Sequence, residues 1–212
     1  MRKPSGVPCS PLGFALANRT VTDAGGNFKK VPAGNHLAVC TQLIDLGTSD
    51  QTYLGVTKHL PKIMVIWEIP DENDLNEPYL VNKEYTKTIC EKANLRKDLE
   101  SWRGKPFDEI ELKGFELKNL LNKCCLLNII YKPNSSYPTI TTVASLPKGT
   151  EQIKPQTEIL FLSFEDLPYQ MNVYEKLPQF IKNKIIKSDE WLAVNGIETH
   201  NTSIDYGEDV PF

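Results

Sequence analysis

The chain has 212 residues, a hydrophobic content of 40% and a formal net charge of -3. This length fits one domain with extensions, because domains usually have about 100–200 residues. No stretch approaches the roughly 18 consecutive apolar residues of a transmembrane helix, and the N-terminus has no apolar run of signal-peptide length. These features argue against a membrane protein and a secreted protein, and they predict a cytoplasmic protein without a membrane partner.

The cysteines and histidines predict neither a metal site nor a catalytic centre. The five cysteines are odd in number, and no pair has the spacing of a zinc knuckle. The three histidines lie far apart in the chain. The sequence contains no phosphate-binding loop, nucleophile elbow or zinc-helix motif. We therefore expect a protein that is not an enzyme and that binds no metal and no cofactor.

The first 34 residues are rich in proline and glycine, which predicts an irregular N-terminal arm. Apolar residues at period two then predict three strands, over 36–46, 62–69 and 79–87. A polar loop is expected over 48–58, between the first two strands. Trp67 lies on the apolar face of the second strand, where a core position is favoured.

The periodicity changes after the third strand. Leu95, Leu99 and Trp102 recur at i, i+4 and i+7, which predicts an amphipathic helix from about residue 91 to Gly104. The elements expected after it are a short helix over 115–121, strands over 124–131 and 139–146, a short apolar segment over 158–164, and a C-terminal helix over 174–187.

Three strands, a helical insertion and two further strands follow the element order of an OB-fold barrel. The sequence therefore predicts a mainly β fold, a closed β-barrel of the OB type, with a helical insertion between strands 3 and 4 and a C-terminal helix. A closed barrel would also hide the sheet edges of a small domain. This OB-fold domain is expected over 35–187, followed by an acidic, flexible tail over 188–212.

The third strand carries a mixture of aromatic and basic residues. Tyr79, Val81, Lys83, Tyr85 and Lys87 share one face because side chains alternate along a strand. Non-specific binding of single-stranded DNA needs this mixture, since rings stack on bases and cations follow phosphates. The alternative is that the tyrosines lie at a core margin, because tyrosine is a good strand former.

The rest of the predicted DNA surface lies on neighbouring elements, because OB-folds bind oligonucleotides on strands 2 and 3 and on the loops after strands 1 and 4. A basic cluster at the end of the first helix could join this surface, or it could be a solvated helix face. The additional candidate residues are Tyr53, Lys58, Lys62, Arg96, Lys97, Arg103, Lys132 and Tyr137.

The charge is distributed unevenly along the chain. No lysine or arginine follows Lys187, whereas six acidic residues do; residues 1–187 carry 24 basic and 21 acidic side chains. A mildly basic body with an acidic tail is the layout expected of a nucleic-acid binder with a recruiting arm.

The chain ends in an acidic run followed by Val-Pro-Phe. A flexible acidic arm with one aromatic anchor is suited to a basic pocket on a partner, although an ordinary acidic terminus ending in phenylalanine is the alternative. The tip resembles that of bacterial-type single-stranded DNA-binding proteins, which recruits replication and repair enzymes. The residues that match this motif are Asp205, Glu208, Asp209, Val210, Pro211 and Phe212.

Four segments of the body resemble a family of small phage and prophage proteins: 46–47, 95–105, 114–121 and 146–149. The resemblance covers about residues 34–187. It implies an OB-fold and single-stranded DNA binding in phage replication or recombination, in the cytoplasm of the host cell.

The predicted function is non-sequence-specific binding of single-stranded DNA, with recruitment of replication or recombination proteins through the tail. The alternative is an interaction adaptor that carries a similar tail but does not bind DNA. Whether the chain forms a homo-oligomer, and whether it prefers DNA or RNA, is left open by the sequence.

Overall fold

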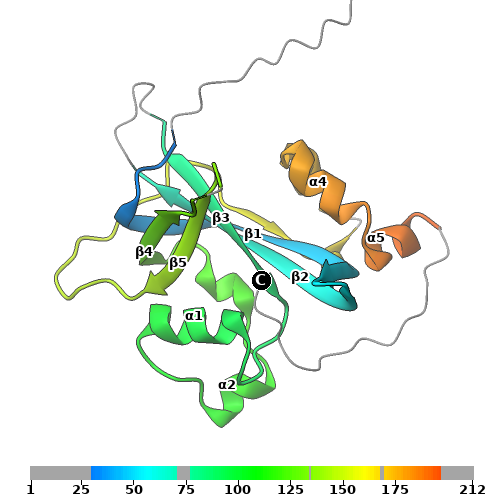
Figure 1. The fold of residues 1–212 in the computed structure, drawn as a ribbon, viewed down its shortest axis with the longest axis horizontal. Helices are drawn as coiled ribbons and strands as arrows, with labels where there is room; N and C mark the ends of the chain where they lie inside the picture. The colour runs from blue at the N-terminus through cyan, green and yellow to red at the C-terminus, as the bar shows by residue number, and fades with distance from the viewer. Residues whose placement is uncertain (1–29, 71–76, 134, 168–169, 197–212) are drawn as a thin grey trace, which may run out of the picture.

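The computed structural model describes residues 30–70, 77–133, 135–167 and 170–196, and its central feature is a six-stranded sheet (Figure 1). The order across the sheet is β3-β2-β1-β4-β5, with antiparallel neighbours, and β6 pairs with β1 in parallel. The strands are β1 (Gly34–Tyr53), β2 (Val56–Ile69), β3 (Tyr79–Thr86), β4 (Cys124–Tyr131), β5 (Pro138–Ala144) and β6 (Leu160–Leu162).

The sheet is open, so the closed barrel predicted from the sequence is wrong. Among the described residues, no backbone ladder joins β3 to β5, although the two strands approach each other. Helix α1 (Asn94–Arg103) contacts both strands, and the Ser145 N–H just after β5 donates to the Ser101 carbonyl at 3.1 Å. The gap between β3 and β5 is thus covered by a helix instead of a ladder. The mainly β fold with helices between β3 and β4 is confirmed.

Strand β1 is long enough to pair with β4 through its first residues, 34–39, and with β2 through its later residues. The ladder with β2 shifts register near Cys40 and again near Asp45, as a bulge does when it bends a strand. Gly47 follows the second shift with φ +71°, in the left-handed region that glycine adopts readily. These shifts direct Cys40 into one core and Ile44 into another.

The first core fills the space between one face of the sheet and the helical insertion. Leu95, Leu99 and Trp102 of α1 are buried in it, as the helical period predicted. The Trp67 and Trp102 rings lie 5.9 Å apart between centroids, and Trp102 Nε1 donates to the Cys124 carbonyl at 2.9 Å. The remaining elements of the insertion are α2 (Glu109–Lys113) and the 3-10 helix η1 (Leu117–Leu120).

A second core covers the opposite face of β1 and β2. Ile44 and Leu46 of β1 and Met64 and Ile66 of β2 form its floor. The cover is made by the C-terminal helices, which lie away from α1 and α2 in Figure 1. The other buried residues of this core are Leu160 and Leu162 of β6, which pairs with β1 within the sheet, and Leu167, Leu177, Ile181 and Ile185 of the C-terminal region.

The C-terminal region contains the 3-10 helix η2 (Phe164–Asp166) and three short helices, α3 (Met171–Lys176), α4 (Gln179–Ile185) and α5 (Asp189–Val194). The sequence predicted a single helix over 174–187. The structure instead has a break at Pro178, whose ring removes a backbone donor and disfavours helix in the preceding residue. Helix α5 lies inside the segment predicted as tail, and the folded part therefore extends beyond residue 187. Among the described helices, none is long and apolar enough to cross a membrane.

The polar segment over 48–58 is not the predicted loop but the distal half of the β1–β2 hairpin. Its turn consists of Leu54 and Gly55, which have φ values of 48° and 80°. Two successive positive φ values match the twist of an antiparallel hairpin. Pairing continues up to Tyr53 and Val56, so polar residues line both strands to the turn.

Candidate nucleic-acid interface

The aromatic-basic face of β3 points into the first core. Tyr85 is only 4% exposed, and Tyr79 packs against the same core. The Tyr85 hydroxyl donates to Asp98 Oδ2 at 2.7 Å, and Lys83 Nζ lies 2.6 Å from the same oxygen. Burial, followed by the Asp98 charge, raises the pKa of Tyr85 well above its ordinary value. The buried Tyr85 ring cannot stack on a base, and the prediction of an outward face on β3 is wrong.

Lys62 and Lys87 lie at the C-terminal end of β3, next to Tyr85. Lys62 is 8% exposed, and its Nζ donates to Thr86 Oγ1 at 3.1 Å. Lys87 Nζ lies 2.7 Å from Asp45 Oδ2, at the second bulge of β1. Both ammonium groups thus have polar partners within the protein, and Lys62 is withdrawn from solvent.

The basic cluster of α1 divides into two structural arginines and one exposed lysine. Arg96 Nε pairs with Glu100 Oε1 at 2.9 Å, one turn along the helix. Arg103 pairs with Glu111 of α2, and its guanidinium carbon lies 4.5 Å from the Phe107 ring centroid. Arg103 therefore holds α1 and α2 together, as an arginine stacked on an aromatic ring can do. Lys97 is exposed to solvent, as is Lys105 just after the helix.

The remaining candidates lie at opposite turns of the sheet. Lys132 and Tyr137 flank the β4–β5 turn and are exposed, with Tyr137 at 79%. Lys58 is half-buried on β2, near the β1–β2 turn, instead of on a loop. The backbone of Tyr53 closes the hairpin, and its side chain lies outside the described part of the structure. The β4–β5 turn thus exposes Lys132 and Tyr137, but the buried Tyr85 of β3 does not extend this exposed surface.

An OB-fold binds its ligand on strands 2 and 3, and here the β2 part of that face is covered by the protein itself. Met64 and Ile66 point to this face and are buried in one core with Ile181 and Ile185 of α4. Glu68 lies on the same face with 0% exposure. Apolar side chains on both sides of this interface indicate a permanent core, because exposing them to water would be unfavourable.

The C-terminal cover has an outer surface that the sequence reasoning missed. Phe180 is 48% exposed on α4, and Lys184 and Lys187 are exposed as well. Ile181 and Ile185 form the buried face of α4, as their spacing predicted, whereas Leu177 is buried but lies in extended backbone before the helix. The missed signal lay between these residues, where the sequence places a ring and lysines on the remaining face of the same helix.

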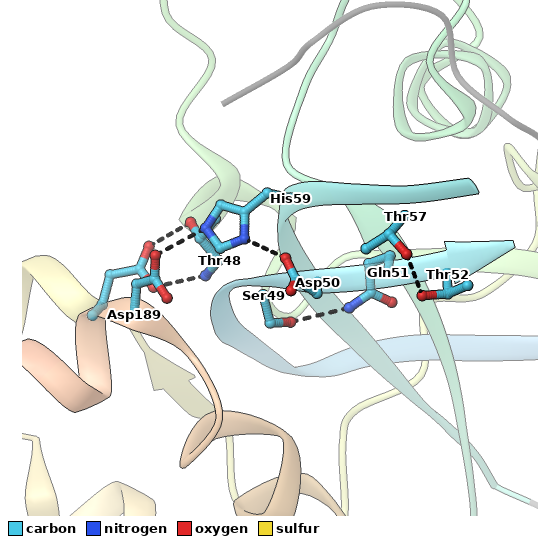
Figure 2. A network of polar contacts seen from close by, with 9 residues as sticks. Thr48, Ser49, Asp50, Gln51, Thr52, Thr57, His59 and Asp189 are labelled. Atoms are coloured by element: carbon cyan, nitrogen blue, oxygen red, sulfur yellow. Dashed lines mark hydrogen bonds and ion pairs between the residues drawn. The ribbon is translucent and has the colours of Figure 1, made fainter. Parts of the chain in front are cut away.

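Helix α5 is fixed to the β1–β2 hairpin by a network of carboxylates (Figure 2). The Glu190 carboxylate accepts from the Thr48 N–H and from Thr48 Oγ1, both at 2.7 Å. His59 Nδ1 lies 2.8 Å from Asp50 Oδ1, and its Nε2 lies 2.9 Å from Asp189 Oδ2. Both partners are carboxylates, so only an imidazolium can donate to both, and the geometry favours the protonated form.

The stability of this network is expected to fall at alkaline pH. The hydrogen bond to Asp50 is the largest influence on the pKa of His59 and raises it. Burial, the next largest, lowers this pKa, but the hydrogen bond to Asp189 and both carboxylate charges raise it again, so the net shift is upward. A raised pKa adds stability that is complete below the unfolded value of about 6.5 and is lost as pH rises through the folded value.

We therefore expect the wild-type protein to lose more unfolding free energy than His59→Gln between about pH 6 and about pH 8.5. Urea unfolding at a series of pH values measures this difference. Parallel pH profiles for the two proteins would contradict the assignment.

The predicted partner-binding residues, from Asp205 to Phe212, lie outside the described residues. Within the described ranges, no group of three or more His, Cys, Asp or Glu side chains is placed to hold a metal ion. In comparisons with known proteins, no family model matches the chain, and no curated protein matches its sequence.

Proposed function

We propose that this protein is an OB-fold protein that binds single-stranded DNA with little sequence preference and recruits replication or recombination proteins through its acidic tail. The observation that carries the proposal is the strand order β3-β2-β1-β4-β5 with α1 inserted between β3 and β4. An OB-fold is a partly open Greek-key barrel, and an oligonucleotide-binding role is common to it. Here the opening would be the gap between β3 and β5 that α1 covers.

The distribution of charge supports the same function. Residues 1–187 have a small basic excess, and the acidic residues beyond them end in Val-Pro-Phe. This tip resembles the recruiting tip of bacterial-type single-stranded DNA-binding proteins. By this proposal the protein acts in the cytoplasm of a phage-infected host cell, without catalytic activity.

A second candidate is an interaction adaptor that does not bind DNA. The burial of Tyr85 and the inward position of Tyr79 favour it, because stacking rings on β3 were the feature that distinguished a DNA binder from an adaptor. The tail is compatible with both candidates.

Fluorescence anisotropy with a labelled oligo-dT, measured over a salt series, tests the proposal. We expect binding that weakens as salt increases, because phosphate contacts release counterions, and weaker binding to duplex DNA of equal length. Absence of binding at low salt would refute DNA binding and leave the adaptor, whereas equal affinity for the duplex would refute the preference for single-stranded DNA.

Deleting residues 205–212 is expected to leave the affinity for oligo-dT unchanged or to increase it. The deletion removes three acidic side chains, and these repel phosphate from any basic surface within reach. It also leaves α5 intact, since that helix ends at Val194. The same anisotropy titration measures the effect, and circular dichroism verifies the fold. Loss of DNA binding by a folded deletion variant would assign the tail a different role.

A further inference from the structure

We propose that the outer face of α4, together with the outer face of β3, forms the surface that contacts single-stranded DNA. The inference rests on the proposed function and specifies its binding site. It follows from the position of the C-terminal cover. The cover packs on the face of β1 and β2, so the surface exposed to solvent on that side of the sheet is the outer side of the cover.

Three exposed residues lie on α4 and on the turn that follows it. Phe180 and Lys184 are spaced at i and i+4, so they lie on one side of α4, and Lys187 follows in the turn just after the helix ends at Ile185. We call these three residues the stripe. Ile181 and Ile185 lie in the second core, where both have 0% exposure. The apolar residues hold α4 against the sheet, and the stripe is left to solvent.

The stripe lies beside the outer face of β3. Lys184 Nζ pairs with Glu84 of β3, which brings the two elements together. Leu80 and Asn82 alternate with the buried residues of β3, and both are exposed. The joint surface therefore offers a ring, an aliphatic side chain, an amide and two ammonium groups.

The charge of this region complements a phosphate chain. Residues 176–187 contain four lysines and no aspartate or glutamate. Glu84 is the acidic residue paired with the stripe, and both members of the pair are partly exposed, with Lys184 at 44% and Glu84 at 32%. Exposed ion pairs are weak, so a phosphate can replace Glu84 as the partner of Lys184.

The combination of residues favours single-stranded nucleic acid over an acidic peptide. A base needs an exposed ring on which to stack, and the phosphates on either side of it need cations at a short distance. Phe180 and Lys184 meet both needs within one helical turn. This is the arrangement that the sequence predicted for β3, and the structure presents it on α4.

The triple variant Phe180→Ala/Lys184→Gln/Lys187→Gln tests the site. The control is Lys148→Gln/Lys154→Gln, which removes two exposed lysines from the segment between β5 and β6. We expect the triple variant to bind oligo-dT at least about 10-fold more weakly, since one stacked base contributes about 1–3 kcal/mol. Its salt slope should be lower by about 1.4, because each phosphate that a lysine no longer neutralises lowers the slope by about 0.7. The control should retain wild-type affinity.

Glu84→Gln provides a second variant with the opposite expectation. It removes the carboxylate that competes with phosphate for Lys184, and it should therefore bind oligo-dT more tightly than the wild type. All the substituted side chains are exposed, so thermal unfolding should be close to that of the wild type, and an altered affinity would report on binding and not on folding.

The outcomes separate this inference from the proposed function. If the wild type binds oligo-dT and the triple variant binds equally well, the α4 site is refuted while DNA binding stands. If the triple variant is weaker only when residues 205–212 are present, the surface binds the acidic tail, and the α4 site is again refuted. If the wild type does not bind, both proposals are refuted.

Discussion

Replacing Ile181 with alanine is expected to lower the free energy of unfolding by about 3 kcal/mol, because a fully buried isoleucine loses its transfer free energy and leaves a cavity. Ile181 lies on the inner side of α4 with 0% exposure, in the second core that also contains residues of β1, β2 and β6. Urea denaturation followed by circular dichroism and tryptophan fluorescence measures the change.

Phe180→Ala is the matched control, because it truncates a large apolar side chain at the adjacent position of the same helix. Phe180 is 48% exposed, so we expect a loss of less than about 1 kcal/mol. Equal losses for the two variants would contradict the described orientation of α4.

The two variants also decide whether the C-terminal cover is a lid or a core. Met64 and Ile66 are buried on β2 only because the cover lies over them. If the cover is a permanent core, Ile181→Ala shifts a single unfolding transition detected alike by both probes. A separate early transition would mean that α4 detaches, and the face of β1 and β2 would then become available to DNA.

The strand and helix positions were largely predictable, because burial imposes a strict period on the sequence. The predicted strand over 124–131 coincides with β4, and Leu95, Leu99 and Trp102 form the buried stripe of α1. These elements have a nearly continuous apolar run or a regular helical stripe, and local sequence is sufficient to recognise both patterns.

The orientation of β3 could not be predicted in the same way. Alternation determines that Lys83 and Tyr85 share a face, but it does not say whether that face is inside. Both side chains are amphipathic, and burial becomes acceptable when a polar partner is supplied. That partner is Asp98, which lies on α1 and reaches β3 only after the chain has folded.

In the C-terminal region, too, the helices could be predicted from local sequence, but their contacts with the sheet could not. The buried positions of α4 follow from the spacing of Ile181 and Ile185. The start of α5 had a local signal, Ser188 followed by two acidic residues, which is typical of a helix N-terminus. Its docking on the hairpin depends on Gly47, where an added Cβ would lie 2.4 Å from Ser188 Cβ. That contact joins residues too distant in sequence for a periodic pattern to detect.

Replacing Glu68 with alanine is expected to lower the free energy of unfolding by about 3 kcal/mol, because hydrogen bonds to a buried charged group are strong and their loss leaves donors without partners. The Glu68 carboxylate accepts from the Gln156 and Thr157 N–H groups at 2.7 Å and from Thr157 Oγ1 at 2.5 Å. These bonds fix the segment that leads into β6, and β6 pairs with β1 and contributes Leu160 and Leu162 to the second core.

Glu158→Ala is the control for this prediction, since it removes a carboxylate from the residue that directly follows Thr157, the partner of Glu68. Glu158 pairs with Lys176 at 2.6 Å, but its side chain is 62% exposed, and an exposed pair contributes less than about 1 kcal/mol. Glu68→Gln should also destabilise, because the amide NH₂ would face backbone donors where the carboxylate oxygen accepts. Wild-type stability in Glu68→Gln would mean that the carboxylate does not hold this segment, and β6 would then depend on its apolar contacts alone.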